Sequence, residues 1–109
     1  MKQVVESCLV AIEGDAASFR AQFLFPGELE VFAGHFPDRP LVPGVFLIEA
    51  VRVAAQKIRG GRLRIARIRD AKFLAIVEPD SPLEVTGSLT GNRCRADLTG
   101  GTRVDLEFS

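Results

Sequence analysis

The feature that most constrains the fold of this chain is one uninterrupted helical segment, residues 45–59. No proline or glycine occurs in it, and Gly60 and Gly61 supply a stop directly after its last Lys and Arg. Apolar residues occur on nearly every side of this helix, which is typical of a helix enclosed by other structure. They are Val45, Phe46, Leu47, Ile48, Val51, Val53, Ala54 and Ile58. The rest of the chain must therefore cover this helix.

The remaining segments are short and are separated by turn residues. Loose apolar alternation predicts a strand over residues 4–12, and clean alternation predicts its hairpin partner over residues 18–25. Four further strands are expected over residues 64–75, 83–90, 93–99 and 103–108. These strands follow one another without βαβ alternation, so the sheet should be antiparallel. The predicted class is α+β, with five to six strands wrapped around the central helix.

Length and composition exclude several classes of protein. The 109 residues favour a single domain over residues 1–109, and a zero net charge argues against nucleic acid as a partner. No apolar run approaches the ~20 residues that span a bilayer, and Glu6 and Glu13 make the N-terminus a poor signal peptide. We therefore expect a cytoplasmic protein with no membrane partner. Cys8 and Cys94 should be small buried hydrophobes, without a disulfide or a metal.

Three features could carry chemistry. His35, the only histidine, lies in a Pro- and Gly-rich segment, residues 27–43, directly before the helix. Glu49 lies in the second turn of the helix, where a carboxylate must pair, take up a proton or face a cavity, because burial without a partner is costly. Pro43 and Gly44 begin the helix, and the Gly44 N–H at the positive end of the helix dipole could hold a carbonyl oxygen that gains charge.

Each feature also has a plainer interpretation. A loop histidine such as His35 is more often a surface residue, and a Pro-Gly pair before a helix usually only marks where the helix begins. Glu49 could form an ion pair with Arg52, three residues later on the same helix face. A neutral imidazole beside a protonated carboxyl is nevertheless the pairing that acid–base elimination needs.

The same residues stand in a frame that resembles the active-site segment of the 3-hydroxyacyl-[acyl-carrier-protein] dehydratases, with the pattern GHFPxxPxxPGVxxxEA. The matching residues are Gly34-His35-Phe36-Pro37, Pro40, Val42-Pro43-Gly44-Val45 and Ile48-Glu49-Ala50. A weaker likeness runs through residues 68–73 and 78–80, so the resemblance covers roughly residues 25–90. It implies the hot-dog fold, and dimers whose sheets join and whose sites take the histidine from one subunit and the acid from the other.

The resemblance also implies an activity, the dehydration of 3-hydroxyacyl thioesters to trans-2-enoyl thioesters in fatty-acid or related biosynthesis. His35 would remove the C2 proton, Glu49 would protonate the departing C3 hydroxyl, and the Gly44 N–H would polarise the thioester carbonyl. The other substrate-binding residues would be Phe36, Pro43 and Val45. The combination of Glu at position 49 and Val at position 45 resembles the branch of the family that only dehydrates its substrate and does not also isomerise the double bond. No dissociable cofactor is implied.

The expected partners are a second copy of the chain and an acyl thioester carried by acyl carrier protein or coenzyme A. The assembly would be a homodimer, or a dimer of dimers or trimer of dimers. Residues 52–72 contain eight basic residues and one acidic residue, Asp70, so this segment has a net charge of +7. The rest of the chain has a net charge of −7. Such a patch could dock an acidic carrier, although a solvated helix end and edge strand would explain it equally well.

Two other functions stay open. In a hot-dog thioesterase, Glu49 would activate water. In a catalytically silent carrier-binding or dimer-partner module, Arg52 would engage Glu49 and no turnover would occur. The family usually has a glutamine one turn after the acid, where this chain has Val53.

Overall fold

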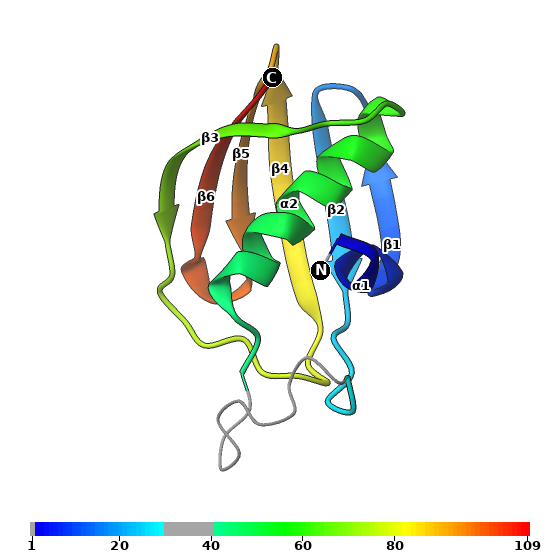
Figure 1. Ribbon diagram of the computed structural model, residues 1–109, viewed down its shortest axis with the longest axis vertical. Coiled ribbons are helices and arrows are strands. Elements are labelled where there is room, and N and C mark those ends of the chain that lie inside the picture. Colours follow the sequence, from blue (N-terminus) through cyan, green and yellow to red (C-terminus); the bar gives the residue numbers. More distant parts are fainter. Residues whose placement is uncertain (1, 30–40) are drawn as a thin grey trace.

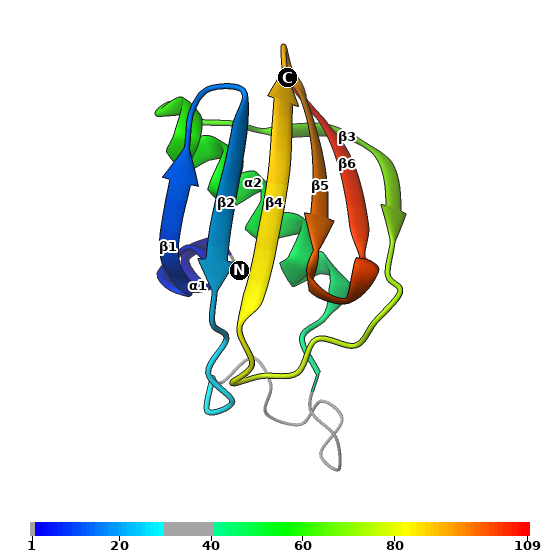
Figure 2. The ribbon, with the colours of Figure 1, turned by 180° about the vertical axis from the view of Figure 1, so that it is seen from behind.

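The computed structural model describes residues 2–29 and 41–109, which form a six-stranded antiparallel sheet with two helices on one of its faces (Figures 1 and 2). The sheet has the order β1-β2-β4-β5-β6-β3. Its strands are β1 (Leu9–Gly14), β2 (Ser18–Phe23), β3 (Ile65–Lys72), β4 (Leu83–Thr90), β5 (Arg93–Leu98) and β6 (Arg103–Phe108). The helices are α1 (Lys2–Ser7) and the central α2 (Gly44–Arg59), and a short 3-10 turn, η2 (Thr99–Gly101), joins β5 to β6. The predicted fold class is confirmed.

The inner face of the sheet forms the core together with α2. Buried and exposed residues alternate along β2, β4 and β5, because successive side chains of a strand point to opposite faces. Phe23 stacks on Phe25 with 6.2 Å between ring centroids, and Phe25 contacts Phe46 at 6.1 Å. These three rings attach the end of β2 to the first turn of α2 and so fix where the helix begins.

Helix α2 has the boundaries that its sequence predicts. Pro43 precedes it in an extended conformation, and its carbonyl accepts the Phe46 N–H at 2.9 Å. Gly60 ends the helix in the left-handed conformation, with a φ of 79° that favours glycine, and its N–H donates to the Gln56 carbonyl at 2.8 Å. The buried helix residues are Phe46, Leu47, Glu49, Ala50, Val51, Arg52, Val53, Ala54 and Ala55. The helix is therefore enclosed on most of its sides, as expected.

The strand predicted over residues 4–12 is wrong in its first half, which forms α1. Val5 is fully buried, and Glu6 pairs with Lys57 of α2, with 3.5 Å between Oε1 and Nζ. Two adjacent valines, Val4 and Val5, do not alternate as a half-buried strand requires, and burying Val5 under a helical turn resolves the conflict. The hairpin itself is confirmed, because β1 pairs antiparallel with β2.

The strand predicted over residues 64–75 ends earlier, at Lys72. Among the described strands, β3 lies at the edge of the sheet and pairs with β6, and its register shifts twice along that neighbour. Beyond it the apolar run of residues 73–77 leaves the sheet. The Leu74 N–H donates to Thr102 Oγ1 at 3.3 Å, and the Val42 N–H donates to the Val77 carbonyl at 2.8 Å. The run is thereby held beside the start of α2.

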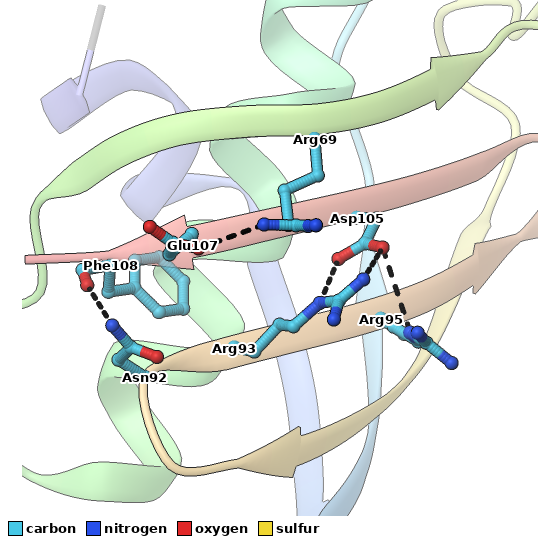
Figure 3. Close-up of polar contacts among 7 residues, drawn as sticks. All are labelled: Arg69, Asn92, Arg93, Arg95, Asp105, Glu107 and Phe108. Carbon is cyan, nitrogen blue, oxygen red and sulfur yellow. Dashed lines mark hydrogen bonds and ion pairs between the residues drawn. The ribbon is translucent and has the colours of Figure 1, made fainter.

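The outer face of the sheet carries ion pairs between neighbouring strands (Figure 3). Arg93 on β5 donates two hydrogen bonds to Asp105 on β6, at 3.1 and 2.8 Å, and Arg69 on β3 contacts Glu107 at 3.2 Å. The hydrogen bonds from Arg93 hold the pKa of Asp105 below its ordinary value, with smaller contributions from the charges of Arg93, Arg95 and Arg69. Opposite charges therefore offset one another across β3, β5 and β6.

Candidate active site

An apolar groove of about 580 Å³ lies between the first half of α2 and the run that follows β3. Its lining consists of Leu41, Val42, Gly44, Val45, Leu47, Ile48 and residues 73–77. Four of its large apolar side chains are unusually exposed: Val45 at 56%, Phe73 at 48%, Leu74 at 68% and Ile76 at 54%. A cluster of exposed apolar side chains of this kind marks a surface that another molecule covers.

Gly44 lies where this groove meets the N-terminus of α2. A Cβ atom at this position would come within 2.9 Å of Phe73 Cζ, so glycine is what permits the Phe73 ring to pack so closely. The first N–H groups of a helix have no acceptor within the helix, and they carry the positive end of its dipole. A carbonyl oxygen that gains negative charge in the groove could therefore be stabilised by the Gly44 N–H.

Glu49 and Arg52 form a buried ion pair on α2, between Glu49 Oε1 and Arg52 Nε. Each residue is only 5% exposed. Arg52 Nη1 also donates to Gln56 Oε1 at 2.9 Å and to the Leu63 carbonyl at 3.2 Å, and the Leu63 N–H donates to the same Gln56 oxygen at 2.9 Å. The ion-pair interpretation of Glu49 therefore holds in this structure, and it is part of a larger network than the sequence indicated.

Glu49 opens on a different cavity from Gly44. A second, more polar cavity of about 420 Å³ is lined by Glu49, Arg52, Arg64, Ile65 and Ser109. None of these residues lines the apolar groove. Within one protomer, the candidate acid and the candidate carbonyl-binding amide thus do not share a cavity.

The residues named from the sequence divide into three groups. Gly44 and Val45 line the apolar groove, with Pro43 directly before them. Glu49 lies apart from them in the polar network. His35 and Phe36 lie outside the described residues, so the structure does not place the candidate base.

Sequence reasoning missed the other wall of the groove. The strand predicted over residues 64–75 includes Phe73 and stops short of Ile76, although the continuous apolar run of residues 73–77 lacks the alternation of a half-buried strand. That lack of alternation was the available signal. Gln56 was missed as well, and nothing local distinguishes it from an ordinary helix-surface glutamine.

The basic patch expected over residues 52–72 is smaller than its composition suggests. Arg52 is buried, so it belongs to the core and not to the surface, which corrects that expectation. Lys57 and Arg69 are engaged by Glu6 and Glu107. The remaining basic residues of the patch are exposed and form no ion pair with a described residue. They are Arg59, Arg62 and Arg64 around the connection from α2 to β3, and Arg67 and Lys72 on β3.

The two cysteines are buried and free, as small hydrophobes would be. Burial raises the pKa of the Cys94 thiol to about 12, and burial also raises that of Cys8. Across residues 2–29 and 41–109, no three His, Cys, Asp or Glu side chains gather closely enough to bind a metal ion. No helix within these ranges has the length and apolar character needed to cross a membrane.

Comparison with known families gives one match over most of the chain. The model of the ApeI-like family, described as ApeI dehydratase, matches residues 11–100. The 3-hydroxyacyl-[acyl-carrier-protein] dehydratase FabZ of Agrobacterium fabrum is 34% identical over 113 aligned positions, covering 91% of this chain and 73% of the relative. FabZ of Lactiplantibacillus plantarum is 41% identical over 61 residues, covering 50% of this chain and 42% of the relative. The match spans about half the length of most of the curated relatives.

Among solved structures, the dehydratase heterocomplex ApeI:P from Xenorhabdus doucetiae is similar over 92% of this chain and 95% of the matched chain, with a TM-score of 0.78. The two sequences are 24% identical, so this likeness establishes the fold, which is the hot-dog fold. The groove, the helix N-terminus and the buried Glu49 therefore lie in a fold that is known to support dehydratases.

Proposed function

Because this chain belongs to the ApeI-like dehydratase family, we propose that it dehydrates 3-hydroxyacyl thioesters to trans-2-enoyl thioesters. The family predicted from the GHFP and PGV motifs is confirmed, and FabZ relatives are 30% to 41% identical to the chain over the aligned residues. The observation that carries the proposal is the apolar groove of about 580 Å³ beside the Gly44 amide. It offers an apolar surface to an acyl chain and an N–H donor to a thioester carbonyl.

The proposed chemistry is an elimination in which protons and electrons balance. His35 takes the C2 proton, the electrons of that C–H bond form the C2–C3 double bond, and the C3–O bond breaks. The departing hydroxyl receives the proton of Glu49 and leaves as water. The Gly44 N–H stabilises the negative charge that develops on the thioester oxygen, which is what makes the C2 proton removable. Val45, Phe36 and Pro43 would complete the binding surface.

The two separate cavities support a site built from two protomers. Gly44 opens on the apolar groove and Glu49 opens on the polar cavity, so one protomer alone does not bring them to a common substrate. β3 is an edge strand beside both cavities, and Ile68 on it is 49% exposed. We place the interface at this edge, where pairing with a second chain would satisfy the free backbone groups of β3.

The substrate carrier is proposed to be an acyl carrier protein or coenzyme A. The exposed arginines Arg59, Arg62 and Arg64 supply positive charge at the polar-cavity side, where Arg64 lines the cavity. Attraction between such a patch and an acidic carrier raises the rate of association and weakens as salt is added.

The test follows enoyl-thioester absorbance with purified protein and 3-hydroxyacyl thioesters of several chain lengths, on carrier protein and on coenzyme A. We expect wild-type turnover, and a fall of about 100-fold or more in kcat for His35→Ala and for Glu49→Gln, since general acid–base groups contribute about 100- to 10,000-fold. Glu84→Gln, an exposed glutamate of β4, is the matched control and should keep full activity. Turnover unaffected by either site variant would reject the mechanism, and release of free thiol would identify a thioesterase instead.

A second candidate is a silent dimer partner, and the Glu49–Arg52 ion pair is the observation that favours it. An acid held as a carboxylate by a guanidinium cannot donate a proton until the pair is neutralised. The structural relative from Xenorhabdus doucetiae is described as a heterocomplex, and a heterocomplex with a second hot-dog chain is the corresponding proposal here. This candidate predicts carrier binding that falls with salt, and no turnover at any chain length by the chain alone.

A further inference from the structure

We propose that Arg52 is a positioning residue that fixes the carboxyl group of Glu49 and stabilises its negative charge during the reaction. The proposal rests on the function proposed above, because it assigns a second residue to the same site. Nothing in the GHFP or PGV motifs points to Arg52. The geometry points to it, through a network on one face of α2 that joins Glu49, Arg52 and Gln56.

The position of Arg52 does not depend on Glu49. Its Nη1 group donates to Gln56 Oε1 at 2.9 Å and to the Leu63 carbonyl at 3.2 Å, and Gln56 is itself held by the Leu63 N–H at 2.9 Å. The guanidinium therefore keeps two acceptors whether Glu49 is ionised or neutral. Arg52 is the fixed member of the pair, and Glu49 takes its orientation from it.

The contact uses only part of the Glu49 carboxyl group. Arg52 Nε engages Oε1, which leaves Oε2 as the oxygen available to a ligand. Glu49 also lines the polar cavity of about 420 Å³, together with Arg64, Ile65 and Ser109. Because Arg52 fixes the orientation of the carboxyl group, Oε2 approaches the 3-hydroxyl of a bound substrate from a single direction. Such fixed orientation matters because a misplacement of about 1 Å can cost about 100-fold in rate.

The pair also has an electrostatic role. When Glu49 gives its proton to the departing hydroxyl, a negative charge appears on a side chain that is only 5% exposed. An equally buried guanidinium in contact with that side chain stabilises the charge as it forms, without any reorganisation at that moment. Arg52 thus favours completion of the proton transfer, because it contacts the carboxyl group on which the negative charge develops.

The alternative to a positioning role is that Arg52 only stabilises the fold, and experiment must distinguish the two. Through Leu63, Arg52 also ties the connection between α2 and β3 to the helix. If that were its only task, its loss would weaken folding and would affect turnover in the same way whether or not Glu49 is present. A positioning role predicts instead that its loss matters only when Glu49 is there to be positioned.

The experiment compares kcat and KM of the full chain for Arg52→Met, Arg52→Lys, Glu49→Gln and the double variant Glu49→Gln/Arg52→Met. We expect Arg52→Met to lower kcat about 10- to 100-fold with KM within about 3-fold. Arg52→Lys keeps the charge but lacks the planar fork of guanidinium donors, so its kcat should lie about 3- to 10-fold below that of wild type. The double variant should be no slower than Glu49→Gln alone, and Arg20→Met, an exposed arginine, is the matched control.

Two results would overturn the proposal while leaving the proposed function intact: wild-type kcat in Arg52→Met, or a double variant clearly slower than Glu49→Gln. If Arg52→Met does not fold, Arg52→Lys decides the matter, because wild-type kcat in that variant excludes a geometric role for the guanidinium. Absence of turnover in the wild-type chain would instead reject the proposed function, and the positioning role with it.

Discussion

The two cavities beside α2 differ in almost every physical respect, although the same helix forms a wall of both. The groove near Gly44 is apolar and lined by exposed side chains such as Leu74 and Ile76. The cavity at Glu49 is polar. Two of its charged groups, Glu49 and Arg52, are buried and paired with each other, whereas Arg64 at its rim is exposed. The exposed apolar side chains of the groove suit contact with an apolar ligand or a second chain. In the polar cavity, by contrast, the Glu49–Arg52 pair is already formed without a ligand.

In the proposed mechanism, this difference lets the helix serve two halves of an elimination. The N-terminus of α2 supplies a backbone donor for a carbonyl, and the side chain of Glu49 further along the helix supplies a carboxyl group. Gly44 and Glu49 lie five positions apart, about one and a half helical turns, so they project in different directions from the axis. For the proposed mechanism, combining the two functions on one substrate therefore calls for two helices, and we propose that one comes from each protomer.

The largest expected effect is on the polar side. Glu49→Ala should lower the free energy of unfolding by about 3 kcal/mol, because it leaves the Arg52 charge buried without a countercharge. Glu84→Ala removes an exposed partner of Arg20, and it should cost less than about 1 kcal/mol. Urea denaturation monitored by circular dichroism measures both. Equal costs would mean that the buried pair is no more coupled than a surface pair.

On the apolar side, Gly44→Ala should lower kcat/KM by about 100-fold, because it moves the groove wall and the helix amide by a fraction of an ångström or more. The added Cβ would lie 2.9 Å from Phe73 Cζ, and the ring must shift. Phe73→Leu should partly rescue the variant by making room. Steady-state kinetics of the single and double variants checks this, and an unaffected Gly44→Ala would remove the groove from the proposed site.

The smallest effect belongs to the outer face of the sheet, far from both cavities. The pKa of Asp105 is lowered, mainly by its hydrogen bonds from Arg93, so the folded state binds the proton more weakly than the unfolded chain. The stabilisation is present above the ordinary aspartate pKa, about pH 4, and is lost as pH falls through the lower folded value. Asp105→Asn should thus be less stable than wild type at pH 7, and the difference should shrink towards pH 3. Denaturation midpoints at both pH values provide the measurement, and a constant difference would contradict it.

Much of the fold was predictable because local and global preferences agree. Strands β4 and β6 have the predicted bounds, since strict alternation and flanking turn residues fix both ends. The prediction failed at α1, where Val4 and Val5 stand side by side, and at the end of β3, where an apolar run left the sheet. At α1, burial of Val5 decided the outcome. After β3, hydrogen bonds to Thr102 and Val42 hold the run beside the start of α2, while Phe73, Leu74 and Ile76 stay about half exposed.

The site was predictable in part. The roles that the motif suggests for Gly44 and Glu49 stay predictions. The spacing of three residues raised the possibility of the Arg52 pair, which the structure contains. The missing alternation of residues 73–77 indicated that Phe73 leaves the sheet. The contact of Phe73 with Gly44 and that of Gln56 with Leu63 could not be inferred, because the path of the chain after each element sets them. Long-range contacts of this kind leave no periodicity in the sequence.

The central claim is that each working site combines the two cavities from different protomers. It is tested most directly by mixing two inactive variants, His35→Ala and Glu49→Gln, under conditions that allow subunits to exchange. In a mixed dimer one of the two sites would hold both residues intact, so an equal mixture should recover about a quarter of wild-type activity. Recovery to that level is the predicted result. A mixture as inactive as its components, with exchange verified by native mass spectrometry, would contradict the account.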